Sequence, residues 1–216
     1  MSVVEDVQQE MLATLYVGQC FPEIRSRIPF GGWAASAAFI AELVSDILMA
    51  ERREVLDCGS GLSTLYAAAA VRRLGRGRVV ALEHDPAYAA RTRQMLALND
   101  LAFVATVVDA SLARQPIEGG THLWYDVHAD AAEGPFDLVI VDGPPQKLSL
   151  MARFGAISRL RQGRPLSLLI DDAHTPETRG VIEAWRGLLD FGAPEPTSSA
   201  SATFQRFAIA PRQVAK

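Results

Sequence analysis

The chain has 216 residues, 49% of them hydrophobic, a formal net charge of −4 and a pI of about 5.6. This length suffices for one domain with a sizeable core, and the apolar content excludes a disordered chain. The acidic balance argues against nucleic acid as the main partner, because phosphate binding needs a basic surface.

The sequence offers no segment typical of export or membrane insertion. The first ten residues are acidic and lack the apolar region of a signal peptide. The longest apolar stretch, residues 33–43, contains Ser36 and Glu42 and is too short to cross a bilayer. Two cysteines are present, Cys20 and Cys58, and the second lies in a glycine loop that disfavours a disulfide. We therefore predict a cytoplasmic protein with no membrane partner.

Two helices are predicted before the first strand. Residues 3–17 carry an apolar stripe at helical spacing, and Pro22 stops the segment that follows. Residues 34–49 form a second helix with one apolar face. We divide the chain into an N-terminal helical extension or lid, residues 1–50, and a main domain, residues 51–216. The first helix would lie outside the main sheet, where it would cover either the active site or a second subunit. A homodimer is therefore one of the two expected arrangements.

The main domain alternates strands and helices, which predicts a doubly wound α/β fold with a mostly parallel, seven-stranded sheet. The predicted strands are 54–58, 78–83, 102–108, 136–141, 166–170, 195–200 and 204–210. The predicted helices are 63–74, 87–98, 147–160 and 176–190. Residues 121–126 are predicted as a short edge strand, and the last two strands of the sheet as a hairpin.

A glycine loop follows the first of these strands. Gly59 and Gly61 allow a sharp turn and a close approach of the backbone to a ligand. A dinucleotide fingerprint has a third glycine, but Thr64 stands at that position. Asp57, two residues before the loop, would repel a pyrophosphate and suits a cation or a hydroxyl-rich group.

Carboxylates also end the next two strands. Glu83 lies about 20 residues beyond the loop, where an acidic side chain binds the two hydroxyls of a ribose. That position by itself is compatible with NAD or with S-adenosylmethionine (SAM). Asp109 follows the third strand. Three successive strands that each end in a carboxylate strengthen the prediction of a ligand site at this edge.

The pattern Asp57-x-Gly59-x-Gly61-x-Ser63 resembles motif I of the class I SAM-dependent methyltransferases, and the resemblance covers about residues 50–210. It implies a Rossmann-like fold in which the loop wraps the methionine end of SAM and Asp57 helps to hold its amino group. It also implies that Asp109 meets the adenine amine. The cofactor-binding residues expected on this basis are Asp57, Gly59, Ser60, Gly61, Ser63, Glu83, His84, Asp109, Ala110 and Asp142.

Strands four and five deliver Asp142 and the pair Asp171-Asp172 to one edge. Like charges this close are costly without a compensating cation or proton, and Mg²⁺ prefers oxygen ligands. This arrangement resembles the metal-dependent small-molecule O-methyltransferases of the catechol, caffeoyl-CoA and macrolide-sugar types. The resemblance implies that all three carboxylates bind a divalent cation, which holds two vicinal acceptor oxygens and lowers the pKa of the hydroxyl.

The general base departs from that family pattern. The catechol type has a lysine three residues after the first aspartate, where this chain has Pro145, with Lys147 two residues later. Lys147 and His174 are the candidate catalytic residues. The alternatives are that Asp142 and Asp172 only cap the following helices and that His174 is a surface residue.

Two further groups of residues are of types that occur in lids or metal sites. The family resemblance makes Phe30, Trp33 and Ser36 candidates for a lid, whereas Phe30 and Trp33 can equally be core anchors. Four metal-capable side chains lack a ligand spacing and are expected in a solvated loop: His122, Asp126, His128 and Asp130.

The sequence thus predicts a SAM-dependent methyltransferase that acts on a hydroxyl of a small molecule or sugar with the help of a divalent metal. The alternatives are a metal-free N- or C-methyltransferase, an aminopropyltransferase, a dehydrogenase-like nucleotide-binding domain, and a non-catalytic SAM-binding module.

Overall fold

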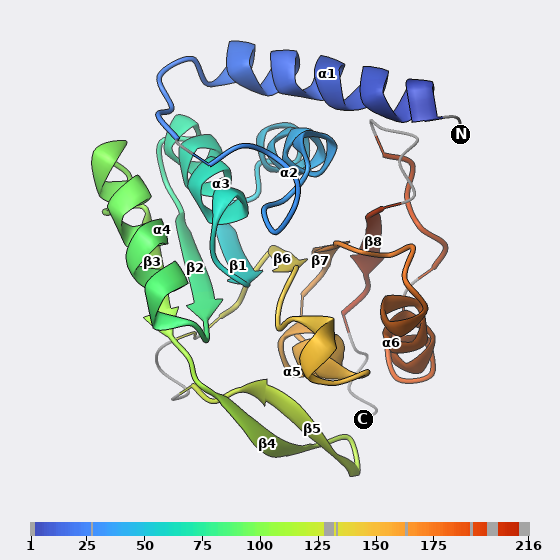
Figure 1. Cartoon of the computed structure of the whole chain (residues 1–216). Helices are drawn as coiled ribbons and strands as arrows, with labels where there is room; N and C mark the ends of the chain where they lie inside the picture. Colours follow the sequence, from blue (N-terminus) through green and yellow to red (C-terminus); the bar gives the residue numbers. More distant parts are fainter. Residues whose placement is uncertain are drawn as a thin grey trace.

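A six-stranded sheet organises the computed structural model, which describes residues 3–26, 28–127, 132, 134–162, 164–190, 192–197 and 203–211. The strand order is β3-β2-β1-β6-β7-β8, and only β8 runs antiparallel to its neighbour (Figure 1). The strands are β1 (Glu54–Cys58), β2 (Arg78–Glu83), β3 (Ala105–Asp109), β6 (Leu138–Val141), β7 (Leu166–Ile170) and β8 (Gln205–Ile209).

The predicted doubly wound α/β architecture is confirmed, with one strand fewer than expected within the described residues. In place of a strand over residues 195–200, Glu195 makes a single bridge to Arg206 of β8. Residues 198–202 lie outside the described residues. Within the described residues, β8 is therefore the last strand of the sheet, with this single bridge beside it.

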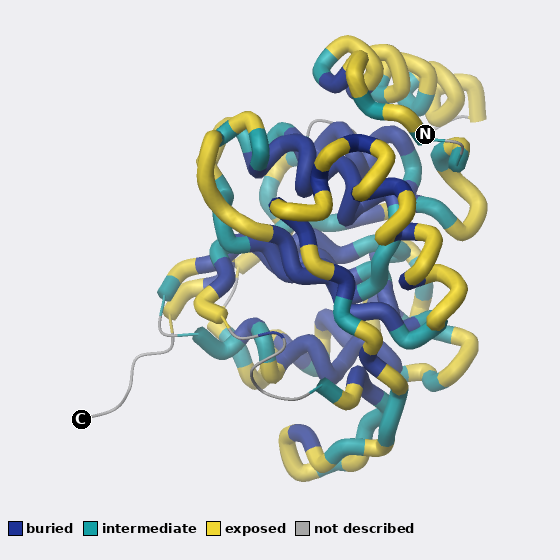
Figure 2. The backbone as a smooth tube through the Cα atoms, turned by 90° about the vertical axis from the view of Figure 1, so that its left-hand side faces the viewer, coloured by how far each residue is buried: buried dark blue, intermediate teal, exposed yellow. Residues whose placement is uncertain are grey.

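The strands at the centre of the sheet are buried on both faces, which explains their nearly continuous apolar sequences. Successive side chains point to opposite faces of a strand. Along β6, Leu138 and Ile140 join one hydrophobic cluster, and Val139 and Val141 join the other. The helices named below cover these two faces, and Figure 2 shows the resulting buried layer through the middle of the molecule.

The helices are α1 (Val3–Cys20), α2 (Ala37–Met49), α3 (Leu62–Arg73), α4 (Pro86–Leu98), α5 (Ile157–Leu160) and α6 (Pro176–Arg186). Three of them, α2, α4 and α6, begin after a residue whose side chain caps the first turn. Asp85 accepts hydrogen bonds from two amides of α4, and Thr175 accepts one from Thr178 in α6. A proline at the first helical position favours the start of both helices.

Two further predicted strands differ from the structure. Residues 102–104 form a turn, and the strand begins only at Ala105. The predicted edge strand over 121–126 is one half of a separate hairpin, β4 (Leu112–Ile117) and β5 (Gly120–Tyr125), which extends away from the sheet (Figure 1). The sequence analysis missed β4, because its polar residues Arg114 and Gln115 and its Pro116 obscure a strand pattern.

The predicted helix 147–160 is a series of short turns. It consists of the 3-10 helices η2 (Gln146–Leu148) and η3 (Ala152–Ala156), followed by α5. Gly155 explains the close packing of η3, since a Cβ at this position would collide with the Trp124 ring of β5. The irregular segment brings the side chain of Arg153 under the ends of β6 and β7.

Helix α1 lies across the outer side of α2 (Figure 1). The Glu10 carboxylate accepts hydrogen bonds from the first amides of α2, Ala37 N at 2.8 Å and Ala38 N at 3.3 Å. Val17 is the one α1 residue that is buried, so most of this helix stays exposed (Figure 2). In the described part of the chain, no helix combines the length and the apolar character needed to cross a membrane.

Candidate cofactor and acceptor site

The glycine loop between β1 and α3 packs directly against the backbone that follows β6. Gly59 has φ of 117°, and a Cβ there would lie 3.1 Å from Gly143 N. Gly59 N donates to Leu82 O at 3.0 Å, and Gly143 N donates to Cys58 O at 2.5 Å. A side chain at Gly59 would separate the two loops, so glycine is required at this position.

Asp57 lies beneath this loop and is fully buried. Its Oδ2 accepts hydrogen bonds from Ser63 Oγ at 2.8 Å and Thr64 Oγ1 at 2.7 Å, both in the first turn of α3. Its Oδ1 is buried without a hydrogen-bond partner in the described residues. Burial raises the pKa of the carboxyl from 3.8 to about 8, although the two hydroxyls oppose the shift. In the free protein Asp57 is therefore mostly protonated near neutral pH.

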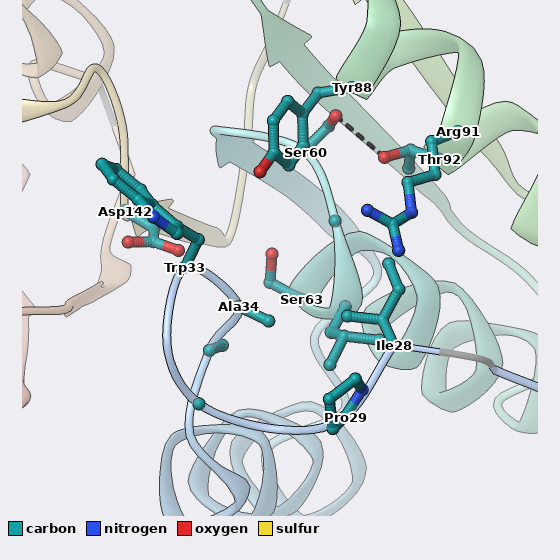
Figure 3. A pocket seen from close by; sticks show the side chains of 14 residues that line it. Ile28, Pro29, Trp33, Ala34, Ser60, Ser63, Tyr88, Arg91, Thr92 and Asp142 are labelled. Atoms are coloured by element: carbon teal, nitrogen blue, oxygen red, sulfur yellow. Dashed lines mark hydrogen bonds between the residues drawn. The ribbon is translucent and has the colours of Figure 1, made fainter.

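Glu83 at the end of β2 holds the loop from the other side. Its Oε2 accepts from Ser60 N and from Ser60 Oγ, both at 3.0 Å, and its Oε1 accepts from Asp85 N at 2.9 Å. His84 Nδ1 lies 3.0 Å from Oε1. Ser60 Oγ also lies 3.0 Å from Thr92 Oγ1, the contact drawn in Figure 3. We call the ends of β1 and β2, with Asp57 and Glu83, the cofactor edge.

Two adjoining cavities open above the loop. The larger has a volume of about 460 Å³ and the smaller about 180 Å³, and they share the lining residues Trp33, Ala34, Ser60, Tyr88 and Asp142. The larger continues along Gly59, Glu83, His84, Tyr125, Lys147, Arg153, Asp171 and Asp172, among others. The smaller is formed by the start of α3, by α4 and by residues 28–35 (Figure 3). The larger volume is typical of sites for small ligands.

The structure brings most of the predicted site residues together at these cavities. The larger cavity is lined by Gly59, Ser60, Glu83, His84, Asp142, Lys147, Asp171 and Asp172, and the smaller also by Gly61 and Ser63. Four predicted residues line neither cavity: Asp57, Asp109, Ala110 and His174.

These four residues have other surroundings. Asp109 pairs in register with Glu83, but its exposed carboxylate forms an ion pair with Arg93 at 2.8 Å. Ala110 is buried, and its N–H donates to Glu83 O at 2.7 Å. His174 is exposed, next to Thr175, which caps α6.

The ends of β6 and β7, with Asp142, Asp171 and Asp172, form what we call the acceptor edge. Burial raises the pKa of Asp171 from 3.8 to about 8, and the charge of Asp142 adds to this shift. Burial also raises the pKa of Asp142, although Arg153 opposes it. Asp172 has φ of 53°, a left-handed conformation that aspartate tolerates better than most residues.

Arg153 lies among these carboxylates and was missed by the sequence analysis. Its side chain is 3% exposed, and its Nη2 donates to Asp142 O at 2.6 Å and to Asp172 Oδ2 at 2.8 Å. Its Nη1 donates to Asp171 O at 2.6 Å and lies 3.5 Å from Thr178 Oγ1. No motif surrounds Arg153 in the sequence. The one available signal was a need for positive charge near three aspartates.

Tyr125 is a second residue that the sequence analysis missed. Tyr125 lines the larger cavity, and its hydroxyl is buried and has no hydrogen-bond partner in the part of the chain that the structure describes. Burial raises its pKa well above 10, so the hydroxyl stays neutral and keeps a proton to donate. An unpaired buried donor of this kind suits a ligand oxygen or nitrogen.

The segment before α2 forms one wall of both cavities. Trp33 is 75% exposed, and Lys147 Nζ lies 4.4 Å from the centre of its ring. Phe30 packs against Tyr66 with ring centres 5.9 Å apart, as expected of a core anchor. Ser36 is the N-cap of α2 and accepts from Phe39 N at 3.1 Å. Of the three lid candidates, only Trp33 faces the site.

The parallel sheet, the glycine loop and the carboxylates at the strand ends together define a class I SAM-dependent methyltransferase site. Residues 56–173 match the profile of a family described as "Methyltransferase domain". Because this match spans more than half of the chain, the chain belongs to that family, and the predicted class is confirmed. No curated protein matches the chain.

Solved structures show the same fold. The O-methyltransferase TomG of Streptomyces achromogenes, involved in tomaymycin synthesis and solved with SAM, is 18% identical, with a TM-score of 0.59 over 97% of this chain and 96% of that chain. An O-methyltransferase from Bacillus cereus with bound SAH is 15% identical, with a TM-score of 0.54 over 94% and 90%. The SAH-bound methyltransferase PaMTH1 of Podospora anserina is 14% identical, with a TM-score of 0.59 over 92% and 86%.

Proposed function

We propose that this protein transfers the methyl group of SAM to a hydroxyl group of a small molecule, including sugars. The observation that carries the proposal is that one cavity continues from Glu83 at the cofactor edge to Asp142 and Asp172 at the acceptor edge. A cofactor and an acceptor can therefore lie side by side in the larger cavity. The O-methyltransferases among the structural relatives support the choice of oxygen as the methylated atom.

The residues of the cofactor edge fit SAM. Glu83 would exchange its bonds to Ser60 for the two ribose hydroxyls, and the backbone of Gly59 and Gly61 allows close approach. Tyr125 offers an unpaired donor. When bound, SAM supplies an electrophilic methyl group. Asp142 of the acceptor edge lines both cavities.

We propose Lys147 as the catalytic side chain of the acceptor edge. It lines the larger cavity, whereas His174 is exposed and outside both cavities, so His174 is the second candidate. The acceptor's hydroxyl proton would pass to the Asp142 carboxylate, which lines both cavities, while the Lys147 ammonium would stabilise the negative charge that develops on the acceptor oxygen. The Trp33 ring lies 4.4 Å from Lys147 Nζ, and this cation–π contact favours the charged form of Lys147 at the larger cavity.

The predicted divalent cation is left out of this mechanism, because the Arg153 guanidinium bonds the Asp172 carboxylate and lies 3.5 Å from that of Asp142. Within the described residues, no group of three or more His, Cys, Asp or Glu side chains is placed to hold a metal ion. The residues at the acceptor edge therefore do not fit the cation. The division at residue 50 and the cytoplasmic location stay predictions.

Calorimetric titration of SAM, and separately of NAD, into the purified protein tests the proposal. We expect SAM to bind and NAD to give no heat, and we expect methyl transfer to hydroxyl compounds in a panel of hydroxyl, amine and carbon acceptors. Absence of SAM binding would overturn the methyltransferase proposal. Transfer to amines or carbon alone would agree with the proposed SAM site. It would replace the hydroxyl acceptor by the N- or C-methyltransferase alternative.

We also propose that a second copy of the chain covers α1. The outer side of this helix exposes Val3, Val4, Val7, Met11, Leu12 and Leu15. A continuous apolar surface of this kind is typical of an interaction site. Sedimentation should show a dimer that Leu15→Glu dissociates and that Leu98→Glu, at an exposed leucine of α4, leaves intact. A wild-type monomer would contradict the proposal.

A further inference from the structure

The acceptor edge contains a fixed positive charge at the position where a divalent cation was expected. Arg153 extends from η3 to the carboxyl ends of β6 and β7 and joins these two strand ends. It bonds Asp142 O and Asp171 O, both at 2.6 Å, and Asp172 Oδ2 at 2.8 Å. Asp142 Oδ1 lies 3.5 Å from the same guanidinium.

These contacts engage one of the three predicted carboxylate ligands, Asp172, and put a positive charge 3.5 Å from a second, Asp142. Mg²⁺ requires about six oxygen ligands near 2.0–2.1 Å in octahedral geometry. Here two carbonyls and one carboxylate already accept N–H groups of a guanidinium that is 3% exposed. A divalent ion at Asp142 and Asp172 would have to share these carboxylates with the guanidinium, whose positive charge repels it.

We propose that the Arg153 guanidinium takes the place of the divalent cation, so that this methyltransferase works without a bound metal ion. The inference rests on the proposed function, because it assigns a role within that reaction. Both Nη atoms already donate to protein acceptors, and Nε is buried without a hydrogen-bond partner in the described residues, so the Nη groups are engaged by the protein rather than by the acceptor. Arg153 is therefore a positioning residue that fixes Asp142 and Asp172.

This assignment narrows the class of acceptor. A metal ion with open positions favours acceptors with two adjacent oxygens, because both can coordinate it. A guanidinium whose Nη atoms donate to protein oxygens offers no such chelation. A single hydroxyl, oriented by Asp142 and Lys147, is then sufficient, and catechol-like acceptors should have no advantage over monohydroxy compounds.

Binding of Mn²⁺ to EDTA-treated protein, followed by electron paramagnetic resonance, tests the assignment. We expect no site in the wild type, a new site in Arg153→Met, and loss of that site in Arg153→Met/Asp142→Asn. Arg153→Lys is the matched control, since it keeps the positive charge and should also bind no Mn²⁺. The new site in Arg153→Met should be at least tenfold tighter than any residual binding to the wild type.

Two results would overturn the assignment. One is a wild-type Mn²⁺ site that Asp142→Asn removes. This comparison does not need the Arg153 variants, so it stays informative even if they fail to fold. The other is a folded Arg153→Met that gains no site, since the carboxylates would then not converge on the guanidinium position. SAM titration of the same samples separates the two proposals. A wild type that binds neither SAM nor Mn²⁺ contradicts the proposed function. That result still agrees with the assignment of Arg153 to the place of the divalent cation.

Discussion

The cofactor edge and the acceptor edge hold their carboxylates in different ways. At the cofactor edge, Asp57 and Glu83 accept hydrogen bonds from Ser60, Ser63 and Thr64, which all lie in or directly after the glycine loop. At the acceptor edge, one guanidinium from a separate segment joins two strand ends. The contacts of Asp57 are local in the sequence, whereas Glu83 and Arg153 both meet their partners through tertiary packing.

The largest effect is expected at the buried carboxyl of the cofactor edge. Asp57→Ala leaves the hydroxyls of Ser63 and Thr64 without their acceptor, which should cost about 2–3 kcal/mol of stability and weaken SAM binding at least tenfold. Asp57→Asn keeps one acceptor oxygen and should bind SAM nearly as well as the wild type. Calorimetry measures both. If Asn is as damaging as Ala, the charge of Asp57 contacts the cofactor, as the family resemblance implied.

The pH dependence of the same residue is a second part of this prediction. The pKa of Asp57 is raised from 3.8 to about 8 in the folded protein. Between these values the unfolded chain releases a proton that the folded protein keeps. The Asp57 contribution to the free energy of unfolding is therefore complete below about pH 4 and falls until about pH 8. Asp57→Asn should remove this loss and be more stable than the wild type at pH 8 by at least about 1 kcal/mol.

Glu83 should have the next largest effect. Glu83→Gln replaces a charged acceptor by a neutral one, so SAM affinity should fall about tenfold, which corresponds to about 1.4 kcal/mol. Asp109→Asn is the matched control, because Asp109 is paired in register with Glu83 but contacts Arg93 instead. It should change SAM affinity by less than about twofold. An equal loss in both variants would place Asp109 at the adenine, as the resemblance implied.

The contrast between the two edges explains what the sequence could predict. Strand alternation and the glycine loop identified the fold and the positions of Asp57 and Glu83, because those signals depend on neighbouring residues. The strand ends also placed Asp142 and Asp171 correctly at one edge. Arg153 could not be predicted, since the segment after Pro145 was expected to be a regular helix and forms 3-10 turns instead.

Two other side chains show the same dependence on tertiary contacts. Asp109 ends a parallel strand, as expected, and its side chain pairs with Arg93 of the preceding helix, while its role in cofactor binding stays a prediction. Tyr125 reaches the cavity on a hairpin whose first strand has no apolar alternation. Strand ends are determined by local patterns, whereas side-chain directions depend on partners that are distant in sequence.

At the acceptor edge, Lys147 should affect turnover without changing cofactor binding. Lys147→Met removes the positive charge near the acceptor, and we expect the rate of methyl transfer to fall about tenfold, or about 1.4 kcal/mol in the barrier. Lys147→Arg keeps the charge and should recover most of the rate. Trp33→Phe controls for the ring contact and should change the rate less. Equal loss with Arg and Met would mean that Lys147 acts as a base, since arginine does not release its proton.

The smallest effect is expected where the acceptor edge already has several bonds to Arg153. Asp172→Asn removes one charged acceptor from the guanidinium but leaves the carbonyls of Asp142 and Asp171 in place, so stability should fall by about 1 kcal/mol. SAM affinity should stay within about twofold, because Asp172 bonds no residue of the glycine loop. Chemical denaturation and SAM titration measure the two quantities. A large loss of SAM affinity in this variant would show that the two edges are energetically coupled, and the separation between them would then have to be abandoned.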